Sequence, residues 1–381
     1  MFLKKCQISR YGEVMNIAID VRSILKKEKT GIGYYTFNLI NALAKIDRNN
    51  DYALYSKIRF FSRDKKPPAL PGENFRHKID RFNLGPPVVL KNTDIFHTSA
   101  YDLKPPKGAK FVITVHDIIP KVFPQGHPKD VLEKLDNLLK SVLAAADVIL
   151  ADTKCTANDL KRHYSGQTGQ KIKVLYPGVG DEFCVLPQEA KNLYKETLLK
   201  YNIYTNYIIY IGTIEPRKNI NGLIKAYKAL KSGHNIKQTL VITGMKGWMY
   251  DDVFKLTEEL GLKKDIVFTG YVPRKDLKVL YNFADVSVYP SFYEGAGLPI
   301  LEAFKCGCPV VTSNVSSMSE LAGDAAVLTD PYKIDSIADG IYSVLSDVGL
   351  RNSLAQKGLK RAAEFSWDMT AKNLLEIFKG F

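Results

Sequence analysis

Short apolar runs that alternate with helical patterns constrain the fold of this chain more than any other feature. The segment MNIAID at 15–20 predicts a first strand, and residues 33–46 carry apolar side chains three apart, which form one face of a helix. Those side chains are Tyr34, Phe37, Ile40 and Leu43. Further strands are expected at DIFHTS, FVITVHD, DVILAD and IKVLYP, and helices at about 128–145 and 156–163. Strands that are apolar along their whole length are buried on both faces, so the alternation predicts an α/β fold with parallel sheets covered by helices.

Glycine and proline interrupt this pattern at YPGVGDEFCVLPQEA (176–190). Strands then resume at YIIYIG, QTLVITG, DIVFTGYV, DVSVYPS and CPVVTS, with helices from Ile220, near 251–260 and 275–283, after Pro299, and from about 334 and 348. A chain of 381 residues exceeds what one core usually accommodates. We therefore expect two Rossmann-like, doubly wound domains, 15–183 and 184–360, facing each other across a cleft, with ligands at the carboxyl ends of the strands. Residues 1–14 are expected to be either a flexible extension or the result of a mis-assigned translation initiation site.

The composition is that of an ordinary globular protein, with 45% apolar and 25% charged residues. No run approaches the roughly 18 apolar residues that span a bilayer, and the start MFLKKCQISRYGEVMN lacks the apolar core of a signal peptide. Five cysteines, an odd number, indicate free thiols in a reducing cytoplasm. Cys306 and Cys308 form a lone C-x-C, so we expect them to pack at a helix end and not to bind a metal.

The net charge of +14 is concentrated in the first half of the chain. Residues 1–185 hold 30 Lys+Arg and 19 Asp+Glu, and residues 186–381 hold 24 and 21, which gives +11 and +3. The excess is dense at 56–66 and 76–81, where Phe60, Phe61 and Phe75 lie among the cations. Two interpretations stay open: an ordinary solvated surface, or a face that meets anionic lipid headgroups or a phosphorylated acceptor. No motif supports a nucleic-acid partner.

The stretch SFYEGAGLPILEAFKCGCPV (291–310) follows a predicted strand and carries two glutamates eight positions apart. Leu298 and Pro299 are expected to open a helix, whose free N–H groups favour negative charge or hydroxyl acceptors. Glu302 falls one turn into that helix among apolar neighbours, where an unpaired carboxylate would cost several kcal/mol. A vicinal diol such as a ribose would satisfy Glu302, and Glu294 would then face a second polyol. The alternative is a core helix in which Glu302 pairs with a lysine or arginine.

Arg217 and Lys218 come just after another predicted strand, in GTIEPRKN, with Asn219 expected as a helix N-cap. An arginine fork and a lysine point charge at a strand's carboxyl end suit a diphosphate. The alternative is two exposed cations in a turn. No Asp-x-Asp occurs in the chain, so no obvious carboxylate pair would hold Mg²⁺, and fixed cations would stabilise the leaving group instead.

A ligand with a ribose, two phosphates and a further polyol, the groups that these sites would bind, is a nucleotide sugar. The segments GTIEPRKN, TGYVP, YPSFYEGAGLPILEAFKCGCPVVTSN and ELAGDAAVLTDP resemble the retaining glycosyltransferases of family 4, whose two-Rossmann architecture is called GT-B. The resemblance runs from about Met15 to the end and is most specific between 207 and 331. KTGIGYY, FHTSAY and TVHDIIP resemble the acceptor-side segments. Within the family, the similarity is greatest to mannosyltransferases that build bacterial surface polysaccharides.

The resemblance implies a role for each matching residue. Arg217 and Lys218 would clamp the donor diphosphate, Glu294 would hold a sugar hydroxyl, and His116 would hydrogen-bond the sugar near the reacting centre. These four are the expected catalytic residues. The expected donor-binding residues are Gly31, Gly33, Asp117, Gly212, Thr213, Tyr271, Val272, Ser291, Gly295, Ala296, Gly297, Leu298 and Glu302.

Four of these expectations are more specific. Gly31 and Gly33 would close over the phosphates, Tyr271 and Val272 would lie near the base, and Glu302 would hold the ribose. The amides of 295–298 would contact sugar and phosphate. Considered without the resemblance, His116 is a structural histidine at a strand end. Ala296 stands where the family usually has an aromatic residue, which leaves the donor preference open.

The resemblance further implies a metal-independent reaction that retains the anomeric configuration, without a carboxylate nucleophile and without a cofactor other than the nucleotide-sugar donor. GDP-mannose is the favoured donor, and a glycan or a polyprenyl-diphosphate-linked oligosaccharide is the expected acceptor. Residues 361–381 would form a helix that returns to the N-terminal domain; the alternative is packing on its own domain. The protein would be cytoplasmic, with weak attachment to the inner membrane face through the basic N-terminal domain.

Three rival functions are weighed. A glucosyl- or N-acetylhexosaminyltransferase would use a UDP- or ADP-sugar. A nucleotide-sugar binder would keep the binding residues without turnover. A Rossmann oxidoreductase is disfavoured, because no G-x-G-x-x-G follows either domain's first strand.

Overall fold

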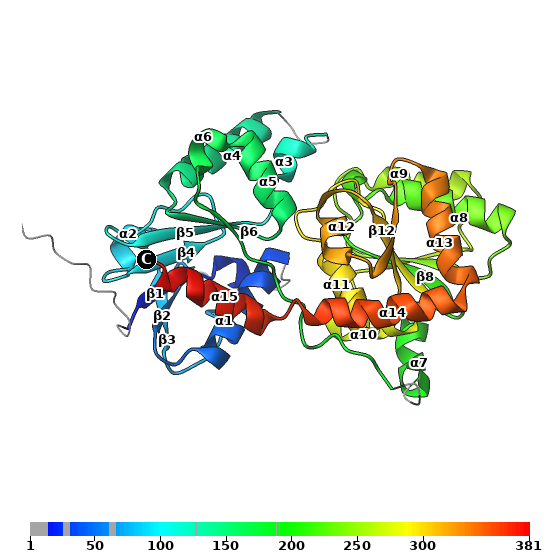
Figure 1. Ribbon diagram of the computed structural model, residues 1–381, viewed down its shortest axis with the longest axis horizontal. Coiled ribbons are helices and arrows are strands. Elements are labelled where there is room, and N and C mark those ends of the chain that lie inside the picture. The colour runs from blue at the N-terminus through cyan, green and yellow to red at the C-terminus, as the bar shows by residue number, and fades with distance from the viewer. Residues whose placement is uncertain (1–13, 26–30, 61–65, 126–128, 188, 190) are drawn as a thin grey trace, which may run out of the picture. The chain divides into compact units, whose positions relative to one another are not determined.

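The computed structural model describes residues 14–25, 31–60, 66–125, 129–187, 189 and 191–381. Two parallel sheets of seven and six strands organise the chain, which confirms the predicted α/β fold (Figure 1). By compactness the chain divides into two units. Unit 1 comprises 1–114, 141–149 and 371–381, and unit 2 comprises 115–140 and 150–370.

The first sheet has the strand order β3-β2-β1-β4-β5-β6-β7. Its strands are β1 Asn16–Asp20, β2 Asp51–Lys57, β3 Phe75–Asp80, β4 Ile95–Thr98, β5 Lys110–Val115, β6 Val148–Ala151 and β7 Ile172–Val174. The helical segments in this part of the chain are η1 Arg22–Leu25, α1 Gly31–Ile46, α2 Pro86–Val89, α3 Ile119–Val122, α4 Lys129–Ala145, α5 Lys154–His163 and α6 Ser165–Thr168.

The second sheet has the order β10-β9-β8-β11-β12-β13, so its first strand in the chain, β8, is central. Its strands are β8 Tyr207–Ile211, β9 Thr239–Thr243, β10 Ile266–Gly270, β11 Val286–Tyr289, β12 Val310–Ser313 and β13 Ala326–Thr329. Helices α8, α9 and α13 gather on one side of this sheet, and α10, α11 and α14 on the other (Figure 1). The helical segments are α7 Lys191–Lys200, η3 Pro216–Lys218, α8 Ile220–Gly233, α9 Asp251–Glu259, α10 Arg274–Phe283, α11 Leu298–Lys305, α12 Ser316–Ala322, α13 Ile334–Ser346, α14 Val348–Ala363 and α15 Trp367–Lys379.

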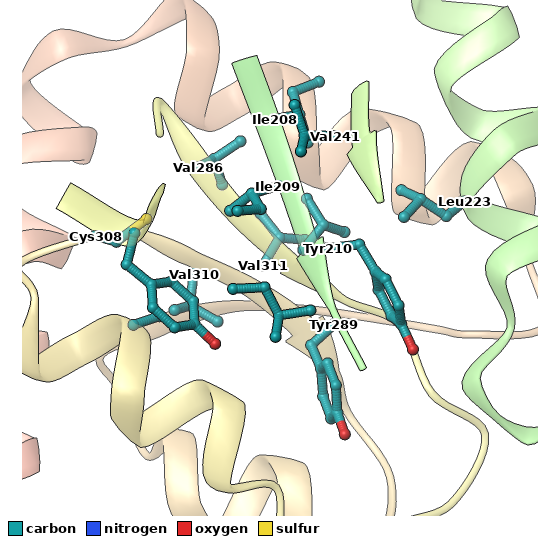
Figure 2. Packing of buried hydrophobic residues seen from close by; sticks show 14 of the residues in the cluster. Ile208, Ile209, Tyr210, Leu223, Val241, Val286, Tyr289, Cys308, Val310 and Val311 are labelled. Atoms are coloured by element: carbon teal, nitrogen blue, oxygen red, sulfur yellow. The ribbon is translucent and has the colours of Figure 1, made fainter. Parts of the chain in front are cut away.

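The core of unit 2 extends to the carboxyl end of its central strands. All five residues of β8 are buried, as are the four of β11. The rings of Tyr210 and Tyr289 stack with centroids 6.1 Å apart, and Figure 2 shows both rings beside the tip of β8. The apolar core therefore ends in two phenol groups at the edge where ligands bind in such sheets.

Several elements were not predicted. Strands β2, β3 and β13 and helices α2, α3, α6, α7 and α12 were missed, and β2 and β3 contain parts of the two basic segments. Phe75, placed among surface cations by the sequence, is buried and stacks on Tyr52 with centroids 4.4 Å apart. That expectation was wrong because Phe75 begins a strand that faces the core. Phe61 and nearly all of the expected extension lie outside the described residues.

Helix α15 has the expected amphipathic character. The side chains assigned to its apolar side are all buried: Trp367, Thr370, Leu374 and Phe378. Residues 371–381 group with unit 1 and residues 367–370 with unit 2. Across the described residues, no helix is long and apolar enough to cross a membrane.

Candidate functional site

Two adjacent cations occupy the turn that follows the central strand β8. Arg217 and Lys218 belong to the short helix η3, and only 7% and 8% of their surfaces are exposed. The turn is held by the backbone N–H of Ile214, which donates to the carbonyl of Met245 at 2.9 Å. A buried cation needs charged or hydrogen-bonding partners, because the free energy lost when an isolated charge leaves water is large. The alternative of two exposed cations in a turn is therefore wrong.

Glu294 is the partner that both cations share. Its two carboxylate oxygens lie 2.7 Å from Arg217 Nη1 and 2.6 Å from Lys218 Nζ. The hydroxyl of Tyr289 accepts from Lys218 Nζ at 2.6 Å and donates to Glu294 at 3.0 Å. Arg217 Nη2 also lies 2.5 Å from Glu215. We call Arg217, Lys218, Glu294, Glu215 and Tyr289 the cation–carboxylate cluster.

The ionisation of this cluster follows from burial and pairing. Burial opposes the charged form of Glu294, yet Lys218 and Arg217 hold its pKa below the ordinary value. Burial lowers the pKa of Lys218, and the attraction of Glu294 offsets this only in part. Burial also opposes the charge on Arg217, but Glu294 and Glu215 raise its pKa. Two cations thus face two carboxylates, and a bound anion would have to displace at least one carboxylate.

Asn219 takes the predicted N-cap position, but its side chain does not cap the helix. It precedes α8, but its side chain caps no backbone N–H, and its φ of 55° is left-handed. Its buried amide donates instead to the carbonyls of Pro290 at 3.1 Å and Pro331 at 2.7 Å. The predicted N-cap position is confirmed, since the Asn219 carbonyl accepts from the N–H of Leu223 at 3.1 Å, but the side chain is directed to two tertiary carbonyls and does not cap the helix. Asn219 thereby ties two distant loops to the cation turn.

The backbone of the loop between β11 and α11 is held by side chains of α12 and of the cation turn. Ser316 Oγ accepts from the N–H of Glu294 at 3.0 Å and donates to its carbonyl at 2.6 Å. Ser317 donates to the same carbonyl at 2.9 Å. Arg217 Nη1 donates to the carbonyl of Tyr293 at 2.6 Å. Glu294 is therefore fixed by contacts from both α12 and the cation turn.

Helix α11 begins at Leu298 with Pro299 in its first turn, as predicted. Gly297 takes the N-cap position, and Ser291 is buried at the start of the loop. Gly295 cannot carry a side chain here, because a Cβ would overlap the carbonyl of His116 and lie 2.5 Å from Asp117 Cβ. The predicted donor-binding residues Ser291, Gly295, Ala296, Gly297 and Leu298 thus lie in one loop and helix start that also carry Glu294.

Glu302 has a protein partner. Its carboxylate lies 3.0 Å from Arg274 Nη1, and Arg274 Nε lies 2.5 Å from Glu182. Burial raises the pKa of Glu302, and Arg274 opposes this shift. The structure thus has the pairing that the sequence left as an alternative, in which Glu302 pairs with an arginine. The ribose contact stays a prediction, and a diol would share this carboxylate with Arg274.

His116 lies directly after β5 and pairs with a carboxylate. Its Nδ1 is 2.8 Å from Asp152 Oδ2, and Asp152 follows β6 directly. Burial opposes protonation of His116, but Asp152 raises its pKa above the ordinary value. Asp117, the next residue, has its pKa raised by burial. The contact orients the imidazole, with Nδ1 donating to Asp152.

The remaining predicted donor-binding residues lie at the ends of other strands. Gly212 and Thr213 follow β8; Tyr271 and Val272 follow β10, with Tyr271 exposed and Val272 buried. Gly31 and Gly33 form the first turn of α1 in unit 1. Cys306 and Cys308 are both buried free thiols beside α11, as expected from packing. Among the described ranges, no group of three or more His, Cys, Asp or Glu could hold a metal ion.

Sequence reasoning missed four contributors: Glu215, Tyr289, Asp152 and Arg274. Glu215 and Tyr289 stand in quoted motifs, in EPRKN and DVSVYPS, but nothing in the spacing pairs them with the cations. Asp152 ends the predicted strand DVILAD, and a carboxylate at that position was a readable signal. Arg274 follows TGYVP, and its partnership with Glu302 depends on how α10 packs against α11.

Comparison with known proteins gives the family. Residues 200–361 match the model "Glycosyl transferases group 1", and residues 30–183 match "Glycosyltransferase Family 4". O-antigen chain mannosyltransferase B of Escherichia coli is 31% identical over 93% of this chain and 97% of its own length. Sucrose-phosphate synthase from Thermosynechococcus elongatus superimposes with a TM-score of 0.77 at 19% identity, covering 96% of this chain and 98% of that one. HepE of Anabaena, solved with UDP and glucose, has a TM-score of 0.71 at 17% identity, covering 96% and 100%. The chain is therefore a GT-B glycosyltransferase of group 1, with an N-terminal part of the family 4 type.

Proposed function

We propose that this glycosyltransferase transfers mannose from GDP-mannose, with retention of configuration, to a glycan or lipid-linked oligosaccharide of a surface polysaccharide. The observation that carries the proposal is the buried Arg217–Lys218 pair at the carboxyl end of β8, joined to Glu294. The similarity to an O-antigen chain mannosyltransferase over 93% of the chain supports mannose as the sugar.

In the proposed reaction, the diphosphate takes the place of Glu294 on the two cations. The phosphate oxygens bind Arg217 as a fork and Lys218 as a point charge. Glu294, released from both cations, accepts a hydrogen bond from a hydroxyl of the donor sugar. The fixed cations stabilise the charge that grows on the leaving diphosphate, and no metal ion is needed for that task.

Bond breaking and bond formation take place on the same face of the sugar. The bond between the anomeric carbon and the diphosphate oxygen breaks, the bond to the acceptor oxygen forms, and the acceptor proton passes to the departing phosphate oxygen. Asp152 holds Nδ1 of His116 at 2.8 Å, which leaves the imidazole oriented as a partner for a sugar hydroxyl. No step uses a carboxylate as nucleophile.

The donor base is tested by thermal unfolding with GDP, UDP and ADP. GDP at 100 times its Kd is expected to stabilise the protein by about 2.7 kcal/mol, a clear rise in Tm, and the other two much less. A larger rise with UDP than with GDP would contradict the GDP-mannose proposal and favour a UDP-sugar transferase. Transfer assays with radiolabelled GDP-mannose then separate an enzyme from a nucleotide-sugar binder, because a binder shifts Tm but yields no product.

We also propose weak attachment to anionic membranes through unit 1. Phe60 and Phe82 are 60% and 71% exposed and pair with centroids 5.3 Å apart, with the Arg81 guanidinium 5.0 Å from the Phe60 ring centroid. The turn that presents Phe82 is fixed, because the Asp80 carboxylate accepts from the N–H groups of Leu84 and Gly85 at 3.0 and 2.9 Å. Exposed aromatic rings beside cations suit the headgroup region of an anionic bilayer.

Vesicle co-sedimentation tests this attachment. Vesicles of phosphatidylcholine with phosphatidylglycerol are expected to bind the protein at low salt and to release most of it at 0.5 M salt. Phe82→Ser is expected to weaken binding about tenfold, because one interfacial ring is lost. The matched control Tyr204→Ser removes an equally exposed ring in unit 2 and should leave binding unchanged. Equal partitioning at low and high salt would reject the electrostatic part of this proposal.

A further inference from the structure

Three aromatic rings form a stack at the edge of the cation–carboxylate cluster. Phe123 lies directly after α3, Phe292 lies in the loop after β11, and Tyr332 lies in the turn after β13. The Phe292 ring is nearly parallel to both neighbours: its centroid is 6.1 Å from Phe123 at 13° and 5.0 Å from Tyr332 at 28°. All three residues belong to unit 2. We call this stack the aromatic platform.

The outer ring of the platform is exposed but held in place. Tyr332 is 71% exposed although its ring stacks on Phe292. Its N–H donates to the Asp330 carboxylate at 3.0 Å, and the Asp330 N–H donates to Ser336 at 3.0 Å. The neighbouring carbonyl of Pro331 accepts from Asn219. A large exposed ring that stacks on Phe292 and stands on a fixed turn loses less freedom when it contacts a ligand.

The platform is tied directly to the cation turn. The N–H of Phe292 donates to the carbonyl of Arg217 at 2.9 Å. The amide of Asn219, the residue after Lys218, binds the carbonyls of both Pro290 and Pro331. One side chain therefore sets the spacing between the two platform loops and the residues proposed to hold the diphosphate.

The strand order indicates which part of a substrate the platform meets. The strands are parallel, so their carboxyl ends share one edge, in the order β10-β9-β8-β11-β12-β13. The residues proposed for the base follow β10, and those for the diphosphate follow β8. Phe292 lies in the same loop after β11 as Glu294, whereas Tyr332 follows β13, two strands further from the base.

We propose that the aromatic platform binds a hexose ring of the acceptor glycan, by stacking on the exposed face of Tyr332. The C–H face of a pyranose fits the electron-rich face of an aromatic ring. This inference rests on the proposed function for its donor orientation. It adds a specificity-determining residue on the acceptor side that the donor-binding loop does not contain.

The test compares Tyr332→Ala, Tyr332→Phe and the exposed control Tyr204→Ala. Initial rates are measured with methyl α-mannoside and α-mannobiose as acceptors at saturating GDP-mannose. Tyr332→Ala is expected to raise the acceptor KM about threefold to tenfold and to leave the donor KM and the GDP-induced Tm shift unchanged. Tyr332→Phe keeps the ring and should behave as the wild-type protein, as should Tyr204→Ala.

Saturation-transfer NMR with methyl α-mannoside and GDP supplies a readout that does not depend on turnover. The wild-type signal is expected to disappear in Tyr332→Ala. If the mannoside signal depends on Tyr332 while no donor supports transfer, the platform stands and the proposed function fails. If transfer occurs but Tyr332→Ala matches Tyr204→Ala, or if the wild-type protein binds neither mannoside, the platform proposal is overturned. An equal effect on the donor KM would also overturn it.

Discussion

Lys218→Ala is expected to turn over about 10²–10³-fold more slowly than the wild-type protein at saturating donor. The lysine Nζ lies 2.6 Å from both Glu294 and the Tyr289 hydroxyl, so its charge is held in place, and only the contact with Glu294 has to give way to the leaving group. Such preorganised charges contribute most where water is excluded, and only 8% of Lys218 is exposed. The measurement is kcat for mannosyl transfer, at donor concentrations far above KM.

The control is Lys225→Ala, which removes an exposed lysine from α8, the helix that follows the cation turn. It should keep near-normal turnover. Circular dichroism establishes that both variants are folded. Near-normal turnover of folded Lys218→Ala would remove the proposed clamp, whatever the donor proves to be.

Glu294→Gln is expected to lower the free energy of unfolding by about 3–5 kcal/mol, the range for breaking a buried ion pair from one side. Lys218 loses its carboxylate partner, while Arg217 keeps Glu215 at 2.5 Å. Urea unfolding measures the change. The control Glu258→Gln breaks an exposed pair with Lys263 and should cost less than about 1 kcal/mol.

The same variant separates a structural cluster from a diphosphate site. In ligand-free Glu294→Gln, Arg217 and Lys218 have only the Glu215 carboxylate near them. A bound diphosphate would supply the missing negative charge. GDP should therefore raise the Tm of Glu294→Gln by more degrees than it raises the Tm of the wild-type protein. A smaller rise than in the wild-type protein would mean that Glu294 helps to hold the nucleotide and does not compete with it.

The parts of the site that were predictable from sequence are those that depend on which element follows which along the chain. A buried strand, a glycine-containing loop and a Leu-Pro helix start place 291–298 at the carboxyl end of β11, and the structure has this arrangement. Arg217 and Lys218 were located in the same way, at the end of β8. Parallel strands bring such loops to one edge, so the pattern also predicted that the two segments meet.

The parts that were not predictable depend on tertiary partners. The burial of Glu302 was readable, but whether its partner is a diol or Arg274 depends on the packing of α10 against α11. Asn219 looks like a helix cap, and only the positions of Pro290 and Pro331 show that its amide is used elsewhere. Cations on β3 interrupt its apolar signal, which explains why that strand was missed; β2, with five consecutive buried residues from Tyr52, was readable and was overlooked.

The central claim is that Arg217 and Lys218 bind the donor diphosphate directly, without a divalent ion. Crystals soaked with GDP-mannose in the presence of EDTA test it most directly. The account predicts phosphate oxygens within hydrogen-bond distance of Arg217 Nη and Lys218 Nζ, with the Glu294 carboxylate turned toward the mannose. Phosphorus atoms remote from the turn after β8, or a requirement for a divalent ion before the nucleotide becomes visible, would contradict it.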